Sequence, residues 1–260
     1  MPKRLLILLF FLTALSGFSQ ARKRTFRQRE LGFFGGGSYY IGDINTRNHF
    51  LATHPAGGIF FRYSTNYRYA FRFGLNYGSI SGNDAASGEP DQIERNLNFK
   101  SKIYEAFSIA EFNFVEYRIG HDRFRFTFFI FAGLGGYMFN PTTNTGNGDQ
   151  PVYQLHNEGT AYSRYQLCVP FGVGMKWTIA EKVGMSFEWG PRRTFTDFLD
   201  DVSGTYPENP SGSGIEGVPN ATSAPGNMRG NPRTRDWYFF FGLSISFALP
   251  DPHRQCHQSL

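Results

Sequence analysis

The sequence has few cysteines and, after its first 20 residues, no long apolar run. Cys168 and Cys256 are the two cysteines among 260 residues. They are too few for a disulfide scaffold and too far apart for a zinc module. No later run approaches the roughly 18–20 apolar residues of a membrane-spanning helix, and the mean hydropathy is −0.37. The low cysteine count excludes a domain stabilised by several disulfides and a zinc module, and the lack of long apolar runs excludes a helical membrane protein.

Aromatic residues and glycines, by contrast, are abundant. The chain contains 29 Phe, 14 Tyr and 30 Gly, and aromatics make up 18% of it. That aromatic content excludes a globally disordered chain. The length suits one domain of moderate size or two small ones. A chain rich in both residue types is typical of all-β proteins, many of which lie in an outer membrane.

Residues 1–19 have the pattern of a secretory signal peptide. Lys3 and Arg4 form a positive n-region, an apolar stretch covers 5–15, and small residues precede Gln20. A short N-terminal anchor helix is the alternative, which the shortness of the apolar stretch disfavours. We therefore expect an exported protein whose signal peptide is cleaved.

The rest of the chain contains eight segments in which side chains alternate between two faces. Such alternation is the mark of a β-strand whose two faces meet different environments. It is clearest over 165–179 and 237–247, where large apolar residues alternate with small or polar ones. The eight segments are 31–41, 57–65, 69–80, 103–117, 124–139, 165–179, 183–190 and 237–247.

The connections between these segments alternate in length. The short ones lie near 66–68, 118–123 and 180–182, and the long ones cover about 42–56, 81–102, 140–163 and 199–235. An even number of strands with this rhythm is typical of an outer-membrane barrel. A soluble sandwich would explain the alternation but not the rhythm or the export signal. The sequence therefore predicts an all-β fold, an eight-stranded antiparallel transmembrane β-barrel over 30–247, with short periplasmic turns and long extracellular loops.

Charged residues fall on the face of the strands that also carries the small residues. An eight-stranded barrel has room inside only for side chains, and opposite charges confined there should pair because an unpaired buried charge is costly. We predict an internal salt-bridge network that keeps the barrel rigid, in preference to a conduction pathway. Its predicted members are Arg62, Arg72, Glu105, Glu111, Arg125, Lys176, Glu188 and Arg192.

No residue pattern requires catalysis. Rim candidates for an active site are His49 and His54 with Asp43 or Asp84, or His156 in the third long loop. Histidines scattered through polar loops are more often solvated, and no nucleophile motif is present. We expect a protein that is not an enzyme, has no cofactor or metal, and binds neither nucleic acid nor a small-molecule substrate.

Three aspartates follow the seventh segment. Asp197, Asp200 and Asp201 could bind calcium, but a loop capped by its own Asp side chains is the favoured interpretation. Both cysteines are expected to be free thiols, with Cys168 in the barrel interior and Cys256 in a periplasmic tail over 248–260.

A basic run precedes the first strand. Arg22, Lys23, Arg24, Arg27 and Arg29 belong to a predicted periplasmic arm over 20–29. Such a run can bind anionic lipid headgroups or an acidic protein partner, and the sequence leaves both open.

Several motifs, spread over nearly the whole mature chain, resemble the PorG-like outer-membrane barrels of Bacteroidota. They are Glu30-Leu31-Gly32, Gly37-Ser38-Tyr39-Tyr40-Ile41-Gly42-Asp43, Arg95-Asn96-Leu97-Asn98-Phe99-Lys100-Ser101, Ile103-Tyr104-Glu105, Glu111-Phe112-Asn113-Phe114, Pro170-Phe171-Gly172-Val173-Gly174, the run from Arg193 to Ser203, Arg229-Gly230-Asn231-Pro232, and Asp236-Trp237-Tyr238-Phe239-Phe240.

The resemblance implies a non-enzymatic component of the type IX secretion system, which exports proteins and serves gliding motility in some species. It implies that the barrel anchors a periplasmic ring built from a PorK-like lipoprotein and its PorN-like partner. The alternative is a stand-alone surface-interaction or adhesion barrel that acts through its long loops, above all 199–235.

Overall fold

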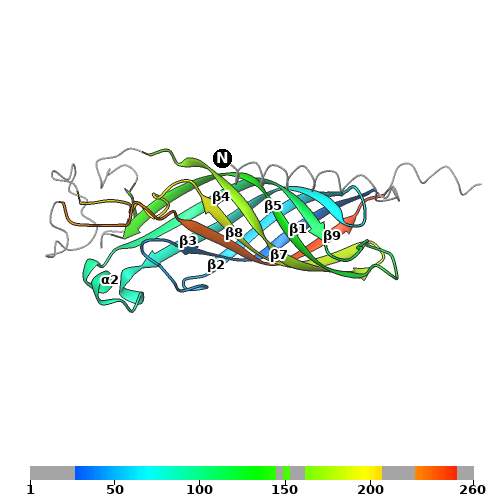
Figure 1. The fold of residues 1–260 in the computed structure, drawn as a ribbon, viewed down its shortest axis with the longest axis horizontal. Helices are drawn as coiled ribbons and strands as arrows, with labels where there is room; N and C mark the ends of the chain where they lie inside the picture. Colours follow the sequence, from blue (N-terminus) through cyan, green and yellow to red (C-terminus); the bar gives the residue numbers. More distant parts are fainter. Residues whose placement is uncertain (1–26, 145–148, 153–161, 207–225, 251–260) are drawn as a thin grey trace, which may run out of the picture.

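The computed structural model describes residues 27–144, 149–152, 162–206 and 226–250. In these residues one antiparallel sheet closes into a barrel (Figure 1). Eight strands form its wall: β1 Gln28–Ile41, β2 His54–Ser64, β3 Tyr69–Asn83, β4 Asn98–Asn113, β5 Phe126–Asn144, β7 Tyr165–Ala180, β8 Val183–Thr194 and β9 Trp237–Ala248. The short β6, Asp149–Pro151, pairs with the end of β5.

Closure follows from the pairing of the first strand with the last. β1 pairs with β9 with Leu31 opposite Phe247, and β4 pairs with β5 with Ile109 opposite Gly133. Each of the eight wall strands is therefore hydrogen-bonded on both sides, which leaves no open sheet edge. The predicted eight-stranded antiparallel barrel is confirmed, and a two-sheet sandwich is excluded.

The long loops gather at one end of the barrel and the short connections at the other. The β3–β4 loop carries the 3₁₀ turn η1, Asp84–Ala86, and the helix α2, Pro90–Arg95, which lies at the long-loop end in Figure 1. Among the described residues no helix is both long and apolar enough to span a membrane. This arrangement divides the barrel into a long-loop end and a short-turn end.

Several predicted strand boundaries differ from the observed ones, and the combined difference at the two ends of β4 is the largest. The segment expected as a strand over 103–117 forms β4 from Asn98 to Asn113, and residues 114–125 leave the sheet. The cause is a change of hydrogen-bond partner, because the Tyr117 N–H donates to the carbonyl of Tyr67 at 3.0 Å rather than to a neighbouring strand. The alternation of side chains continues past Asn113, so the sequence pattern did not reveal this break.

The two faces of the wall have opposite character. Large apolar side chains point outward and are exposed, among them Phe33, Phe73, Leu75 and Leu134, the last with 71% of its surface exposed. Arginines, a lysine and glutamates point inward and are buried. A soluble protein has the reverse distribution, whereas a barrel surrounded by lipid has this one.

Candidate functional site

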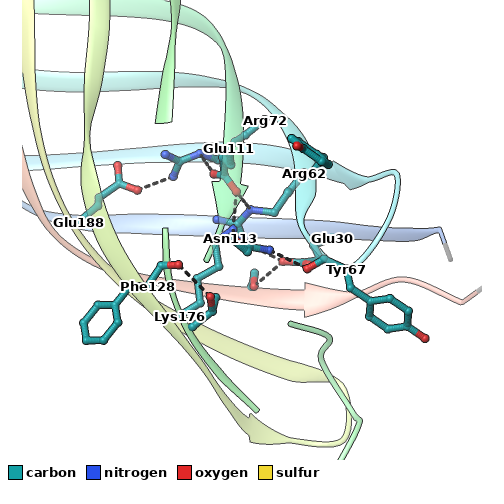
Figure 2. A network of polar contacts seen from close by, with 12 residues as sticks. Glu30, Arg62, Tyr67, Arg72, Glu111, Asn113, Phe128, Lys176 and Glu188 are labelled. Carbon is teal, nitrogen blue, oxygen red and sulfur yellow. Dashed lines mark hydrogen bonds and ion pairs between the residues drawn. The ribbon is translucent and has the colours of Figure 1, made fainter. Parts of the chain in front are cut away.

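The first part of the barrel interior is organised around one glutamate. Glu111 of β4 contacts Arg62 Nε at 2.9 Å, Arg72 Nε at 2.8 Å and Lys176 Nζ at 2.6 Å (Figure 2). The cations come from β2, β3 and β7, so this carboxylate joins four strands. Asn113 adds an amide oxygen 3.0 Å from Lys176 Nζ.

The same network extends to two further strands, β1 and β8. Arg62 Nη1 lies 2.7 Å from Glu30 Oε2, and Arg72 Nη1 lies 2.6 Å from Glu188 Oε2. Aromatic rings fill the space between the charges, and the Phe60 ring lies 4.9 Å from the guanidinium carbon of Arg62. Contacts of a cation with a ring face are favourable where water is excluded.

A second cluster lies nearer the long-loop end. Glu105 accepts hydrogen bonds from Arg192 Nε at 3.1 Å, the Tyr238 hydroxyl at 2.7 Å and the Asn76 amide at 2.9 Å. Cys168 Sγ lies 3.3 Å from the Tyr238 hydroxyl and is a free, buried thiol. Cys256 lies outside the described residues.

Seven of the eight residues predicted for the interior network are buried there. They are four cations and three carboxylates, and Glu30, which was not predicted, is the fourth buried carboxylate. The placement of Arg125 was wrong. Its side chain is exposed, because β5 begins one residue later and Arg125 belongs to the preceding connection. A charge-balanced interior satisfies the condition under which buried ions are tolerated.

At the short-turn end, residues 114–125 fold across the barrel mouth. Ile119 is buried. Its carbonyl accepts a hydrogen bond from Gln28 Nε2 at 3.2 Å, and its N–H donates to Gln28 Oε1 at 3.3 Å. Gly184 lies directly beneath, where a Cβ atom would come within 2.7 Å of Ile119 Cδ1. Thr178 Oγ1 donates to the Arg118 carbonyl at 3.4 Å. We call residues 114–125 the short-turn cap.

On the outer surface of this end, cations outnumber carboxylates. The exposed carboxylates are Asp122 and Glu181, and the exposed cations are Arg27, Arg68, Arg123, Arg125 and Lys182. Arg68 also donates to the Phe114 carbonyl at 2.9 Å.

Two members of the predicted basic arm are described. Arg27 is exposed just before β1, whereas Arg29 lies within β1 opposite Tyr63, so the arm ends earlier than predicted. Arg22, Lys23, Arg24 and the predicted signal peptide lie outside the described residues.

At the long-loop end one arginine, Arg95, is hydrogen-bonded to residues of different loops. Arg95 Nε and Nη2 contact the Asp84 carboxylate at 2.7 and 2.8 Å. The same guanidinium donates to the Asp43 carbonyl at 3.0 Å and to the Arg229 carbonyl at 2.5 Å. Asp43, Asp84 and Arg229 belong to the β1–β2, β3–β4 and β8–β9 loops, so Arg95 joins three loops. We call the parts of these loops around Arg95, Asp43, Asp84 and Arg229 the long-loop cap.

Carboxylates lie beneath this cap. The Tyr40 hydroxyl donates to Asp200, and it lies 3.2 Å from Asp236 Oδ1. The Leu199 N–H donates to Asp236 Oδ2 at 2.9 Å. Burial, followed by repulsion from neighbouring carboxylates including Asp43, raises the pKa of both Asp200 and Asp236 well above the ordinary range of an Asp.

The aspartates considered for calcium are engaged within the protein. Asp197 accepts from Ser203 Oγ at 2.8 Å, Asp200 from the Val202 N–H at 3.0 Å, and Asp201 from the Tyr162 hydroxyl at 2.6 Å. Among the described residues no group of three or more His, Cys, Asp or Glu side chains is arranged to hold a metal ion. The geometry is that of a loop capped by its own Asp side chains.

The rim histidines do not meet the aspartates proposed for them. His49 folds onto the outside of the wall, where its ring lies 5.5 Å from that of Phe239 and its Nδ1 lies 3.1 Å from the Tyr39 hydroxyl. His54 Nε2 lies 2.7 Å from Ser81 Oγ. Asp43 and Asp84 are held in the long-loop cap, and His156 lies outside the described residues.

Sequence reasoning did not identify Tyr40, Arg95, Arg229 or Gln28 as structural centres. A signal existed for Tyr40, since the alternation of the first strand places it on the inward face with Glu30. Arg95 and Arg229 lie in irregular loops, where no period assigns them a direction.

A sequence model of the family described as "Domain of unknown function (DUF6089)" matches residues 3–258. No curated protein matches the chain.

Solved barrels resemble the fold at low identity. Ail, the attachment invasion locus protein of Yersinia pestis, is 10% identical, with 86% of this chain and 99% of that chain covered and a TM-score of 0.43. Neisserial surface protein A is 9% identical, with 84% of this chain and 96% of that chain covered and a TM-score of 0.41. The N-terminal β-barrel domain of Pseudomonas aeruginosa OprF is 9% identical, with 86% of this chain and 100% of that chain covered and a TM-score of 0.38. Identities and TM-scores this low carry no functional inference.

Proposed function

Because the chain belongs to the DUF6089 family, which assigns it no activity, we propose a function from the geometry: a sealed outer-membrane barrel that anchors a periplasmic assembly. The observation that carries this proposal is the combination of a filled interior with a basic, capped short-turn end.

The outward face supports a place in a membrane. Its exposed apolar side chains form a belt around the wall, and the eight wall strands have 11 to 19 residues. A tilted strand needs roughly 9–11 residues to cross a bilayer. Short turns in barrels of this kind lie in the periplasm and long loops outside the cell.

The interior supports a structural role rather than transport. The charges around Glu111 and Glu105 are paired, and rings such as Phe60 and Phe107 lie against Arg72. The short-turn cap covers one mouth and the long-loop cap the other. Paired charges and packed rings leave side chains, rather than water, along the barrel axis.

The short-turn end supports an anchoring role. Its exposed cations, Arg68, Arg123, Arg125 and Lys182 among them, outnumber its exposed carboxylates, Asp122 and Glu181, so it attracts an acidic protein surface. The resemblance to PorG-like barrels suggests the partners, a PorK-like ring lipoprotein and a PorN-like protein of the type IX secretion and gliding machinery.

The test is purification of tagged protein from its native membrane in mild detergent, with mass spectrometry of the proteins that come with it. We expect the wild type to recover periplasmic ring proteins. A variant with Arg68→Gln, Arg123→Gln and Arg125→Gln should lose them, whereas Arg233→Gln with Arg235→Gln, at the long-loop end, should not. Recovery of the bare barrel after crosslinking would overturn the anchor.

A second candidate is a surface-interaction barrel. The observation that favours it is the long-loop cap, in which Arg95 holds three loops in one arrangement. A preorganised surface binds a partner with little ordering cost. In this case Arg95→Ala would abolish cell-surface binding and leave the periplasmic partners in place.

A further inference from the structure

The charges on the barrel wall are sorted by sign. Among the described residues of the eight wall strands, every carboxylate belongs to the buried inward set of Glu30, Glu105, Glu111 and Glu188. The charged residues at outward positions of these strands are all cations, namely Arg29, Lys100, Lys102 and Arg193. The outer surface of the wall, in the part of the chain that the structure describes, is otherwise uncharged, so its charge is entirely positive.

Two of these cations lie together near the long-loop end. Lys100 and Lys102 occupy successive outward positions of β4 and are both exposed. Lys102 lies opposite Ser79 of β3 and Asn140 of β5. No ion pair of either lysine occurs among the described residues. Two ammonium groups flanked by hydroxyl and amide groups form a surface that suits phosphate.

An apolar groove begins directly below the lysines on the same face. The next outward positions of β4 are Tyr104 and Ala106, and Ala106 forms the groove floor together with Gly136 of β5. Its walls are lined by Leu75 and Leu167, and its volume is about 900 Å³. The groove continues toward the middle of the wall past Ser108. The small residues Ala106 and Gly136 of the floor, between the larger Leu75 and Leu167, leave an apolar groove along the wall.

We propose that this face, over β3, β4 and β5, binds a phosphorylated, multiply acylated lipid of the lipid A class. Its phosphates lie at Lys100 and Lys102, and one acyl chain lies in the groove over Ala106 and Gly136. The proposal rests on the outer-membrane location proposed above, which places the long-loop end in the outer leaflet. Charge complementarity selects a phosphorylated lipid over an uncharged one, since an uncharged lipid gains nothing from the two lysines.

The first test compares lipids on the full-length protein folded in detergent, by native mass spectrometry. The probes are bisphosphorylated lipid A, lipid A without its phosphates, and phosphatidylcholine. We expect selective retention of bisphosphorylated lipid A. Lys100→Gln with Lys102→Gln should weaken it about 30-fold, on the basis of about fivefold for each cation. The matched control is Arg123→Gln with Lys182→Gln, which removes two exposed cations at the short-turn end.

A second variant tests the groove independently of the charges. A Cβ atom at Gly136 would find its nearest neighbour, the Gln166 carbonyl oxygen, at 4.0 Å, so a side chain can start from the groove floor without a clash at its Cβ atom. Gly136→Leu therefore places apolar bulk on the groove floor and keeps the wall apolar. Retention of lipid A should fall, while the preference for phosphates is kept.

Membrane insertion is measured in parallel by flotation with phosphatidylcholine vesicles. A wild type that does not insert would contradict the proposed function itself. A wild type that inserts but binds both forms of lipid A equally would overturn only the lipid site, as would a lysine variant that inserts and binds lipid A as the wild type does. If the double variant does not insert, Lys102→Gln alone is used, with an expected loss of about fivefold.

Discussion

The side-chain amide of Gln28 is hydrogen-bonded to both backbone groups of Ile119. Its Nε2 donates to the Ile119 carbonyl at 3.2 Å, and its Oε1 accepts from the Ile119 N–H at 3.3 Å. The two residues are 91 positions apart, one at the start of β1 and the other in the middle of the short-turn cap. This pair therefore fastens the cap to the first strand and closes the barrel at the end where a periplasmic partner is proposed to dock.

Gln28→Ala should loosen the short-turn cap without unfolding the barrel. It removes two partly buried hydrogen bonds, together worth about 1–2 kcal/mol of local opening free energy. Hydrogen exchange of the Ile119 amide should become about tenfold faster, while exchange in β9 stays unchanged. Gln92→Ala, which removes an amide at the opposite end, should leave Ile119 protected. Unchanged protection of Ile119 in Gln28→Ala would show that the cap is held by other contacts.

Glu111→Gln should destabilise the whole barrel. The substitution keeps the shape of the side chain but leaves Arg62, Arg72 and Lys176 around a neutral amide, and removal of one partner from a buried ion network costs about 3–5 kcal/mol. Urea unfolding in lipid vesicles measures this loss.

The matched control for that variant is Glu181→Gln, an exposed carboxylate in the β7–β8 turn, which should change stability by less than about 1 kcal/mol. Adding Lys176→Met to Glu111→Gln should restore part of the loss, because it removes one of the cations left unpaired. Equal stability of Glu111→Gln and the wild type would mean that water reaches the interior charges.

The long-loop cap should be more stable in acid than at neutral pH. The folded carboxyl groups of Asp200 and Asp236 have a raised pKa, whereas an Asp of the unfolded chain has a pKa of about 3.9. The folded cap thus binds protons more tightly than the opened one. Its stability is greatest below about pH 4 and falls as the pH rises toward the raised pKa values.

Hydrogen exchange of the Leu199 and Val202 amides, corrected for intrinsic rates, should follow this trend between acid and neutral pH. Asp236→Asn keeps an oxygen for the Leu199 N–H and removes one of the facing charges, so it should flatten the dependence and protect the cap at neutral pH. Asp91→Asn, at an exposed position of α2, should leave the profile as in the wild type. Protection that rises with pH in the wild type would contradict the direction of both pKa shifts.

The alternation of side chains in the sequence was sufficient to predict the strands of the wall and which of their residues face inward. In β9 the run from Trp237 to Phe247 assigns each side chain to a face, and inward positions such as Arg62, Glu105 and Lys176 follow from the same period of two. The reason is that a strand exposes successive side chains to opposite sides, so a local pattern records which environment each residue meets.

Tertiary structure alone decided which charges meet and how the ends are closed. Glu111 is bound by cations that are 49, 39 and 65 residues away in sequence, and such partners depend on strand order and register. Arg125 was misplaced because a period of two cannot show where a strand begins. The two caps depend on Gln28 and Arg95, whose contacts come from distant loops without any period. Local alternation therefore determined the faces of this barrel, whereas closure of the sheet determined its ion pairs and its caps, since only closure brings remote strands and loops into contact.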